Sequence, residues 1–252
     1  MKCCYGWIGA LRFCSTIITI VLALAALPAL AEGSDVDIAA LLRSLSSDPH
    51  YNTSMMQQQE PGAIAAAQQA VWRDKLGLQL RLRNGKQLSL PDSKECGTAT
   101  EVVAHNCTSF IYLGHEERAH LYQVFESDLE GGDFLVVDDL SGAMWRLSDY
   151  PATSPDGTRL AVFKNNDMGS EQGIEIWSRA SGSMTLEWSG DPFGEGAKVR
   201  RYYFLVGWTS ETEMKLRVVG QAEAEDSRAL RCGLTALRRS TSGWEASKLH
   251  DC

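Results

Sequence analysis

The chain has 252 residues, seven cysteines and a formal net charge of −8. This acidic balance argues against a nucleic-acid-binding protein, which needs a basic face. The same balance permits attraction to a cationic protein partner, although a net charge of this size is commonly a device for solubility. The length is sufficient for one domain with a sizeable hydrophobic core.

Residues 1–31 have the features of a signal peptide. Lys2 and Arg12 supply positive charge, Ile17–Leu27 is an apolar run, and Ala29–Ala31 has the A-x-A form of a cleavage site. The alternative is an uncleaved anchor, but the run is shorter than the ~20 residues that a spanning helix needs. The sequence therefore predicts a periplasmic or secreted protein with no stable membrane insertion after cleavage.

Four cysteines remain once the predicted signal peptide is removed, because three of the seven lie within it. An even number of cysteines in an exported protein favours disulfides over thiol chemistry. The absence of a C-x-x-C motif argues against a zinc ribbon or a redox site. Of the three possible pairings, the most local one predicts the bonds Cys96–Cys107 and Cys232–Cys252.

The segment 32–77 is predicted to be helical, with a linker in its middle. Apolar residues of 35–45 recur at helical spacing behind Asp35, a residue type that caps helices. Residues 46–62 are polar and rich in turn formers, which is typical of a linker. Residues 61–76 begin at a proline and are rich in Ala and Gln, which predicts a second helix. That helix is expected to pack on the domain through Ile64, Val71 and Trp72.

From residue 78 onward the apolar period changes to two, which is typical of strands. Residues 78–90 alternate apolar and polar side chains around Asn84-Gly85, a strong hairpin signal. This half unit places Arg81, Arg83 and Lys86 on one face. The three side chains could form a basic binding strip, but a solvated outer face is the better account of them.

Three longer units follow in the predicted β-repeat domain 78–252, near 108–150, 151–195 and 200–250. Each contains two hairpins, and the second hairpin pivots on a Ser-Gly pair, where glycine supplies a positive φ. The pairs are Ser141-Gly142, Ser181-Gly182 and Ser242-Gly243. Five tryptophans fall within these units and are expected to pack between sheets: Trp145, Trp177, Trp188, Trp208 and Trp244.

The middle unit carries a family resemblance. Its "SPDGTRLAVF" followed by "GIEIWSRASG" resembles the TolB-like and WD-repeat β-propeller families. The resemblance implies that Ser154–Gly157 is the turn between the first two strands of a blade and that Trp177 lies on the third strand. Closed propellers have about four to eight blades, more than this chain supplies. We therefore expect a mainly β fold: an open arc or two-sheet sandwich of four-stranded units with N-terminal α-helices covering the edges. Closure as a homodimer is the alternative.

The motifs that suggest catalysis or metal binding are weak. In "HEERAH" the two histidines, His115 and His120, are five residues apart, whereas a zincin helix needs a spacing of four. Residues that far apart on one strand point to opposite faces, and so do the adjacent Asp138 and Asp139. The acidic loops 126–133 and 165–173 lack the spacing of a calcium loop. No G-x-S-x-G elbow is present, and we expect no catalytic residue, cofactor or metal site.

The sequence thus favours an exported, non-enzymatic binding or interaction module. A sharper alternative is a periplasmic inhibitor of a secreted enzyme such as lysozyme, since such inhibitors are also small, acidic, disulfide-bonded β proteins. A second alternative is a hydrolase whose site is assembled from dispersed loops, and a third is an envelope-assembly component. For the hydrolase, the residues to suspect are His115, His120, Asp138, Asp167 and Glu171.

Overall fold

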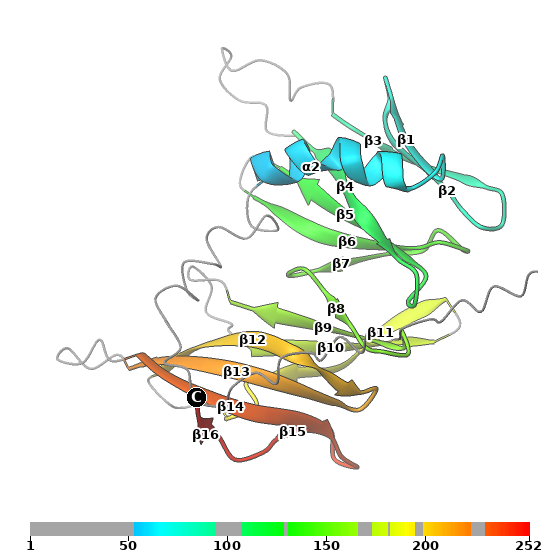
Figure 1. Cartoon of the computed structure of the whole chain (residues 1–252). Coiled ribbons are helices and arrows are strands. Elements are labelled where there is room, and N and C mark those ends of the chain that lie inside the picture. The colour runs from blue at the N-terminus through cyan, green and yellow to red at the C-terminus, as the bar shows by residue number, and fades with distance from the viewer. Residues whose placement is uncertain are drawn as a thin grey trace, which may run out of the picture. The chain divides into compact units, whose positions relative to one another are not determined.

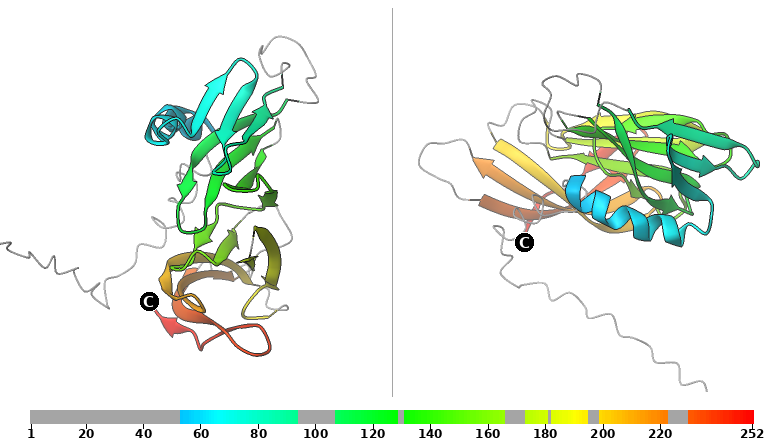
Figure 2. Two further views of the ribbon diagram at one scale, coloured as in Figure 1. Left: turned by 90° about the vertical axis from the view of Figure 1, so that its right-hand side faces the viewer. Right: turned by 90° about the horizontal axis from the view of Figure 1, so that it is seen from above.

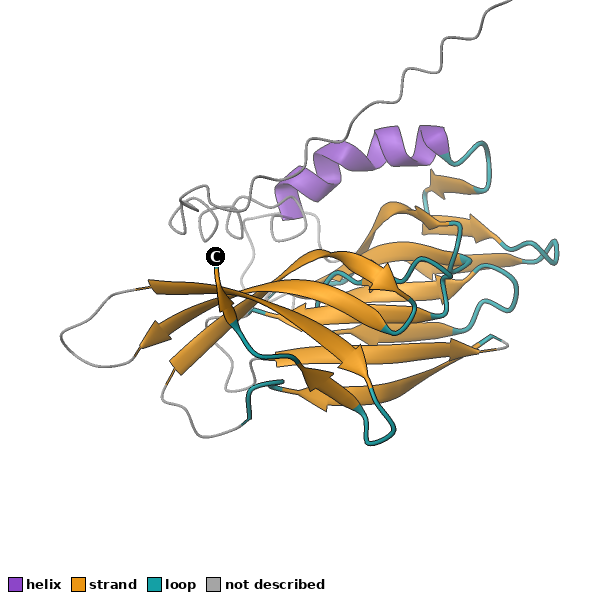
Figure 3. Cartoon of the chain, turned by 60° about the horizontal axis from the view of Figure 1, so that its bottom comes forward, coloured by secondary structure: helices purple, strands orange, loops and turns teal. Residues whose placement is uncertain are grey.

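A computed structural model describes residues 53–93, 107–128, 131–165, 173–180, 182–194, 199–222 and 230–252. These residues form one helix and four antiparallel sheets (Figure 1, Figure 3). The helix is α2 (Thr53–Ala66). The first sheet contains β1 (Val71–Asp74), β2 (Gly77–Arg81) and β3 (Gln87–Pro91), and the second contains β4 (Ser109–Glu116), β5 (Leu121–Ser127), β6 (Gly132–Asp138) and β7 (Met144–Leu147).

The third sheet contains β8 (Ala152–Thr153), β9 (Arg159–Lys164), β10 (Gly173–Ala180) and β11 (Ser183–Gly190). The fourth contains β12 (Val199–Ser210), β13 (Glu213–Ala222), β14 (Leu230–Arg239), β15 (Trp244–Ala246) and β16 (His250–Asp251), which pairs with β14. Within each sheet the strands follow one another in chain order. The expected mainly β fold built from repeated hairpins is confirmed.

Successive sheets pack face to face through three hydrophobic cores. In β5, Val124 faces the first sheet and Phe125 the third, so the second sheet is buried on both faces. The strand β9 behaves in the same way, and its residues Leu160–Phe163 are all buried. Both alternating sets of these residues are buried because a sheet lies on each side. The five tryptophans of the repeats pack into or against these cores as expected.

The outer face of the first sheet is polar. Gln79 donates a hydrogen bond to the hydroxyl of Ser89 and accepts one from the side chain of Gln87. These residues point away from Leu78 and Leu80, which face the second sheet. Trp72 of β1 also lies on this face, beside the end of α2. The described residues do not form a closed propeller.

Helix α2 lies along the edge strand β4 (Figure 1, Figure 2). A carboxylate oxygen of Glu60 accepts a hydrogen bond from the backbone N–H of Tyr112 at 2.8 Å, and Asp92 accepts one from that of Phe110 at 3.0 Å. Arg73 pairs with both carboxylates. The N-terminal segment therefore covers a strand edge, as expected for an incomplete propeller, and gives that edge charged partners.

The helix boundaries differ from those expected. The described residues contain a single helix, which begins at Thr53, within the predicted linker, and passes through Pro61. Burial of Met56 and the anchoring of Glu60 on β4 stabilise the turns that precede the proline. The predicted helix 61–76 ends early because Gln68 and Gln69 have positive φ, and Val71–Asp74 is then the strand β1. The predicted helix at 35–45 lies outside the described residues.

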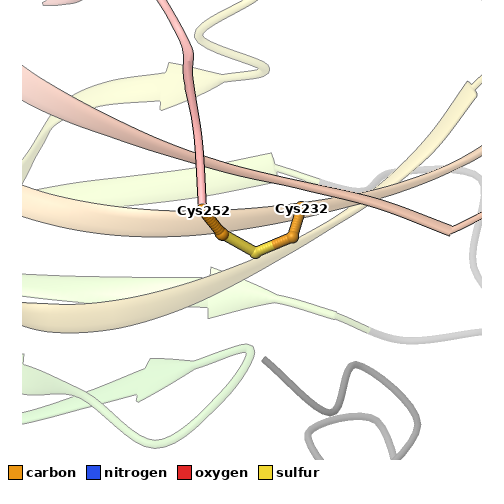
Figure 4. The surroundings of a disulfide bond; sticks show 2 residues. All are labelled: Cys232 and Cys252. Atoms are coloured by element: carbon orange, nitrogen blue, oxygen red, sulfur yellow. A yellow bond between two sulfur atoms is a disulfide. The ribbon is translucent and has the colours of Figure 1, made fainter. Parts of the chain in front are cut away.

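The predicted disulfide between Cys232 and Cys252 is present (Figure 4). Its Cα atoms are 5.5 Å apart, and it ties the end of the chain to β14 next to the short strand β16. Closing a loop of this size stabilises a fold by roughly 3 kcal/mol in the chain-entropy account. Cys107 is also disulfide-bonded, but Cys96 lies outside the described residues, so the bond between these two stays a prediction.

The turn Ser154–Gly157 is the tight turn that the sequence indicates. The N–H of Gly157, whose φ is +72°, donates to the carbonyl of Ser154. Asp156 is a structural turn residue here, since its carboxylate accepts hydrogen bonds from Ser154 and Thr158. A Cβ at residue 157 would overlap the carbonyl oxygen of Arg118 in the β4–β5 turn. Glycine is therefore required both by the backbone conformation and by the close approach of another sheet.

We expect Gly157→Ala to lower the free energy of unfolding by at least ~2 kcal/mol, because strain and steric overlap add. The matched control is Gly85→Ala. Gly85 also has a positive φ, +83°, but a Cβ there meets no atom within 4 Å. That control should cost only about 1 kcal/mol. Urea unfolding of both variants measures the difference, and equal losses would contradict the proposed contact between the turns.

Candidate functional site

The buried carboxylate of Asp139 gathers three basic side chains. Asp139 is 1% exposed. Its Oδ1 lies 2.7 Å from Nε of Arg83, and its Oδ2 lies 3.0 Å from Nε2 of His115 and 3.6 Å from Nδ1 of His120. Such a convergence of titratable groups around one buried acid is the most concentrated polar chemistry in the described part of the chain, so we take it as the candidate site.

Three turns position these groups. Arg83 lies in the turn between β2 and β3, His120 in the turn between β4 and β5, and Asp139 directly after β6. The backbone N–H of Asp139 donates to the carbonyl of His120, and the carbonyl of Asp139 accepts from the N–H of Arg83. These main-chain bonds hold the turns side by side and fix the acid between the basic groups.

The expectation that His115 and His120 point to opposite faces was wrong. Only His115 lies on the strand, whereas His120 lies in the turn with a φ of +52°. This left-handed conformation redirects its side chain toward the same carboxylate. The segment is a hairpin turn, as the sequence predicts, but the strand periodicity does not extend through it.

The expectation for Arg83 needs a similar correction. It was placed on a solvated face with Arg81 and Lys86, but its guanidinium pairs with Asp139 while about half of its side chain stays exposed. The hairpin loop begins after β2 ends at Arg81, so the alternation no longer determines the direction of Arg83. Arg81 and Lys86 are exposed as expected.

Tyr122 forms one wall of the site. Its ring lies 4.9 Å from that of His115, and its hydroxyl donates to the carbonyl of Arg81 at 2.6 Å. Burial and the negative charge of Asp139 raise the pKa of Tyr122. The phenol is therefore a neutral hydrogen-bond donor that ties β5 to β2 beside the carboxylate.

Asp138 points to the opposite side of the second sheet, as the sequence predicts. Its Oδ2 lies 2.6 Å from Nη2 of Arg179, which belongs to the third sheet. Its Oδ1 accepts hydrogen bonds from the backbone N–H and the hydroxyl of Ser141. Burial raises the pKa of Asp138, but these bonds outweigh burial and hold the pKa below its ordinary value.

A third arginine–carboxylate link joins the third and fourth sheets. Glu187 on β11 pairs with Arg159 of its own sheet at 2.9 Å and with Arg239 at the end of β14. Arg159 also donates to the carbonyl of Glu211, in the turn between β12 and β13. Each pair of neighbouring sheets is therefore linked by such a contact, at the end of the sheets where the turns β2–β3, β4–β5, β6–β7 and β12–β13 lie.

Four turns form one surface, which we call the turn face. They are residues 82–86, 117–120, 139–143 and 154–158. Each touches the next: Asn84 donates to the carbonyl of Leu140, Asp139 bonds His120, and Gly157 lies against Arg118. The turn face is thus one continuous surface built from three sheets.

The Asp139 site contains some of the groups that a hydrolase needs but lacks others. A carboxylate beside an imidazole can orient a general base. A nucleophile within hydrogen-bond reach of the base is also needed, and no hydroxyl or thiol bonds either histidine within the described ranges. Arg83 also neutralises the acid. Of the other suspected residues, Asp138 serves the link to Arg179, whereas Asp167 and Glu171 lie outside the described residues.

The same part of the chain contains neither a metal-binding cluster nor a membrane-spanning helix. No group of three or more His, Cys, Asp or Glu side chains there could hold a metal ion. No helix of the described residues is both long and apolar enough to cross a membrane. A scan of protein-family models and searches of curated proteins and of solved structures find no match to this chain.

We expect Asp138→Asn to lower the free energy of unfolding at neutral pH by about 3 kcal/mol, because the variant leaves the buried Arg179 unpaired. The pH dependence should change as well. Since the folded-state pKa of Asp138 is lowered from 3.8, its contribution is complete above that pH and is lost as the pH falls through the folded pKa. As the pH falls below about 4, the free energy of unfolding should therefore decrease less in the variant than in the wild type.

Urea unfolding at a series of pH values measures both effects. The control is Asp133→Asn, an exposed position on the same strand β6, which should change the stability by no more than about 0.5 kcal/mol. A wild-type pH profile in Asp138→Asn would contradict the role of the link between sheets.

Proposed function

We propose that this chain is an exported, non-enzymatic protein-binding module that contacts its partner through the turn face. The observation that carries the proposal is the fixed backbone of that surface. Ion pairs and main-chain hydrogen bonds link its turns across three sheets. A preorganised surface loses little conformational entropy when it binds, which favours affinity.

An exposed apolar side chain stands at the centre of this surface. Leu140 is 50% exposed, although both of its neighbours, Asp139 and Ser141, are held by hydrogen bonds. Half-exposed Arg83 and His120 lie on the same surface, where both approach the neighbouring Asp139. An apolar centre with a polar rim is the usual anatomy of a protein interface.

Further properties of the partner and of the fold belong to the same proposal. The net charge of −8 attracts a cationic protein partner at long range, whereas the charged groups described on the turn face itself, Arg83 and His120, are basic. The signal-peptide pattern of residues 1–31 places the encounter in the periplasm or outside the cell. We also interpret the four-stranded sheets as propeller-type blades of the TolB-like or WD-repeat kind, used here as a scaffold for loops.

The hydrolase alternative has one observation in its favour. His115 and His120, two of the suspected residues, meet at Asp139. Against it stand the pairing of Asp139 with Arg83 and the lack of a bonded nucleophile in the parts of the chain described here. We therefore rank the binding module first.

The proposal is tested by pull-down from the native envelope with purified protein carrying Leu140→Glu. The variant should lose the partner that the wild type retains, because a charge replaces the apolar anchor. Leu76→Glu is the matched control. Leu76 is 57% exposed, but it lies in the β1–β2 turn, at the other end of β2 from the turn face.

Retention of the same partner by both variants would contradict the assignment of the turn face. Loss of the partner only in Leu76→Glu would also contradict it, and would indicate that the partner binds around the β1–β2 turn. Measurable hydrolysis of envelope substrates that disappears in His120→Asn would instead favour the hydrolase.

A further inference from the structure

A small cavity lies between the end of helix α2 and the first sheet, away from the Asp139 site. Its volume is about 450 Å³, within the range of small-molecule sites. Ile64, Ala65 and Val71 supply its apolar surface. Trp72 and Arg81 line it from the first sheet, and two glutamines line it from the turn that joins α2 to β1.

Arg81 has no acidic partner among the described residues. Eight other arginines in the described ranges form ion pairs: Arg73, Arg83, Arg146, Arg159, Arg179, Arg201, Arg238 and Arg239. The guanidinium of Arg81 instead lies over the ring of Trp72, 5.6 Å from its centroid. A cation–π contact of this kind leaves the N–H groups of the guanidinium free to donate hydrogen bonds. The cavity is thus lined by a cation whose charge is not neutralised within the described residues.

The turn at the cavity rim is strained. Gln68 and Gln69 have φ values of +47° and +71°, a conformation that residues other than glycine rarely adopt. Both side chains line the cavity. Strained backbone of this kind is concentrated at ligand-binding sites, where the surrounding structure maintains it. The strain is therefore an observation independent of the cavity and of Arg81.

We propose that this cavity binds a monocarboxylate with an apolar body. The single unpaired guanidinium matches the charge and the planar, bidentate geometry of one carboxylate group. A phosphate dianion would need further positive charge, and the nearby Arg73 is already paired with Glu60 and Asp92. The apolar residues accept an aliphatic or aromatic body, and the glutamine amides can bond its polar edge. The carboxylate belongs either to a free organic acid or to the C-terminus of a peptide.

Isothermal titration calorimetry with the purified chain tests the proposal. The probes are 3-phenylpropionate and its amide, and the peptide acetyl-Gly-Gly-Phe with a free or an amidated C-terminus. We expect at least one acid to bind with a dissociation constant of about 1 mM or tighter, and its amide to bind at least tenfold more weakly. Binding of the free acid alone identifies a small-molecule site, and binding of the peptide acid identifies a site for a chain terminus.

The variant Arg81→Gln should weaken binding of the acid at least tenfold. Lys75→Gln is the control, since Lys75 is an exposed cation in the β1–β2 turn, outside the turn face, and has no ion pair among the described residues. It should bind as the wild type does. A thermal melt checks that the variants fold, and the comparison of acid with amide on the wild type does not depend on them. Equal binding of acid and amide, undiminished binding to Arg81→Gln, or no saturable binding of either acid would overturn the proposal. None of these outcomes affects the turn face, which lies elsewhere.

Discussion

Two adjacent carboxylates on the second sheet hold three sheets together. Asp139 binds Arg83 of the first sheet, and Asp138 binds Arg179 of the third. Neighbouring residues at the end of a strand point in opposite directions, so one dipeptide reaches both flanking sheets. Both acids are almost fully buried, and a buried charge without its partner is costly. Any shift of one sheet along the next would separate these partners, so the ion pairs specify how the sheets are aligned, beyond what apolar packing does.

A fold that does not close into a ring must also protect its edges and its ends. Glu60 and Asp92 occupy backbone N–H groups of β4, and the side chain of Asn165 bonds both the N–H and the carbonyl of Tyr203 on the edge strand β12. The polar outer face around Gln79 ends the series of sheets. In each place a hydrogen-bonding side chain replaces the neighbouring strand or sheet that a closed propeller would provide.

The hairpins could be predicted from the sequence because they depend on local signals. Asn84-Gly85, the Ser-Gly pairs and Pro155-Asp156-Gly157 act within a few residues, and period-two alternation marks the strands. The Asp139 site could not be predicted, since it joins turns that are far apart in the chain and depends on the left-handed φ of His120. Non-local contacts also explain why the start of α2 at Thr53 could not be predicted. Burial of Met56 and the contact between Glu60 and β4 are tertiary, and they outweigh the linker-like composition before Pro61.

The two proposed sites differ in how their charged groups are paired. At the turn face the buried acids are neutralised internally, so what remains for a partner is a rigid backbone, an exposed leucine and half-exposed basic groups. At the cavity beside α2 the opposite holds, because the guanidinium of Arg81 lies over the ring of Trp72 and has no counter-ion among the described residues. A chain with a net charge of −8 has ample acid to pair with this arginine. That it leaves Arg81 unpaired, beside two strained glutamines, is explained if the partner of that cation comes from outside the chain.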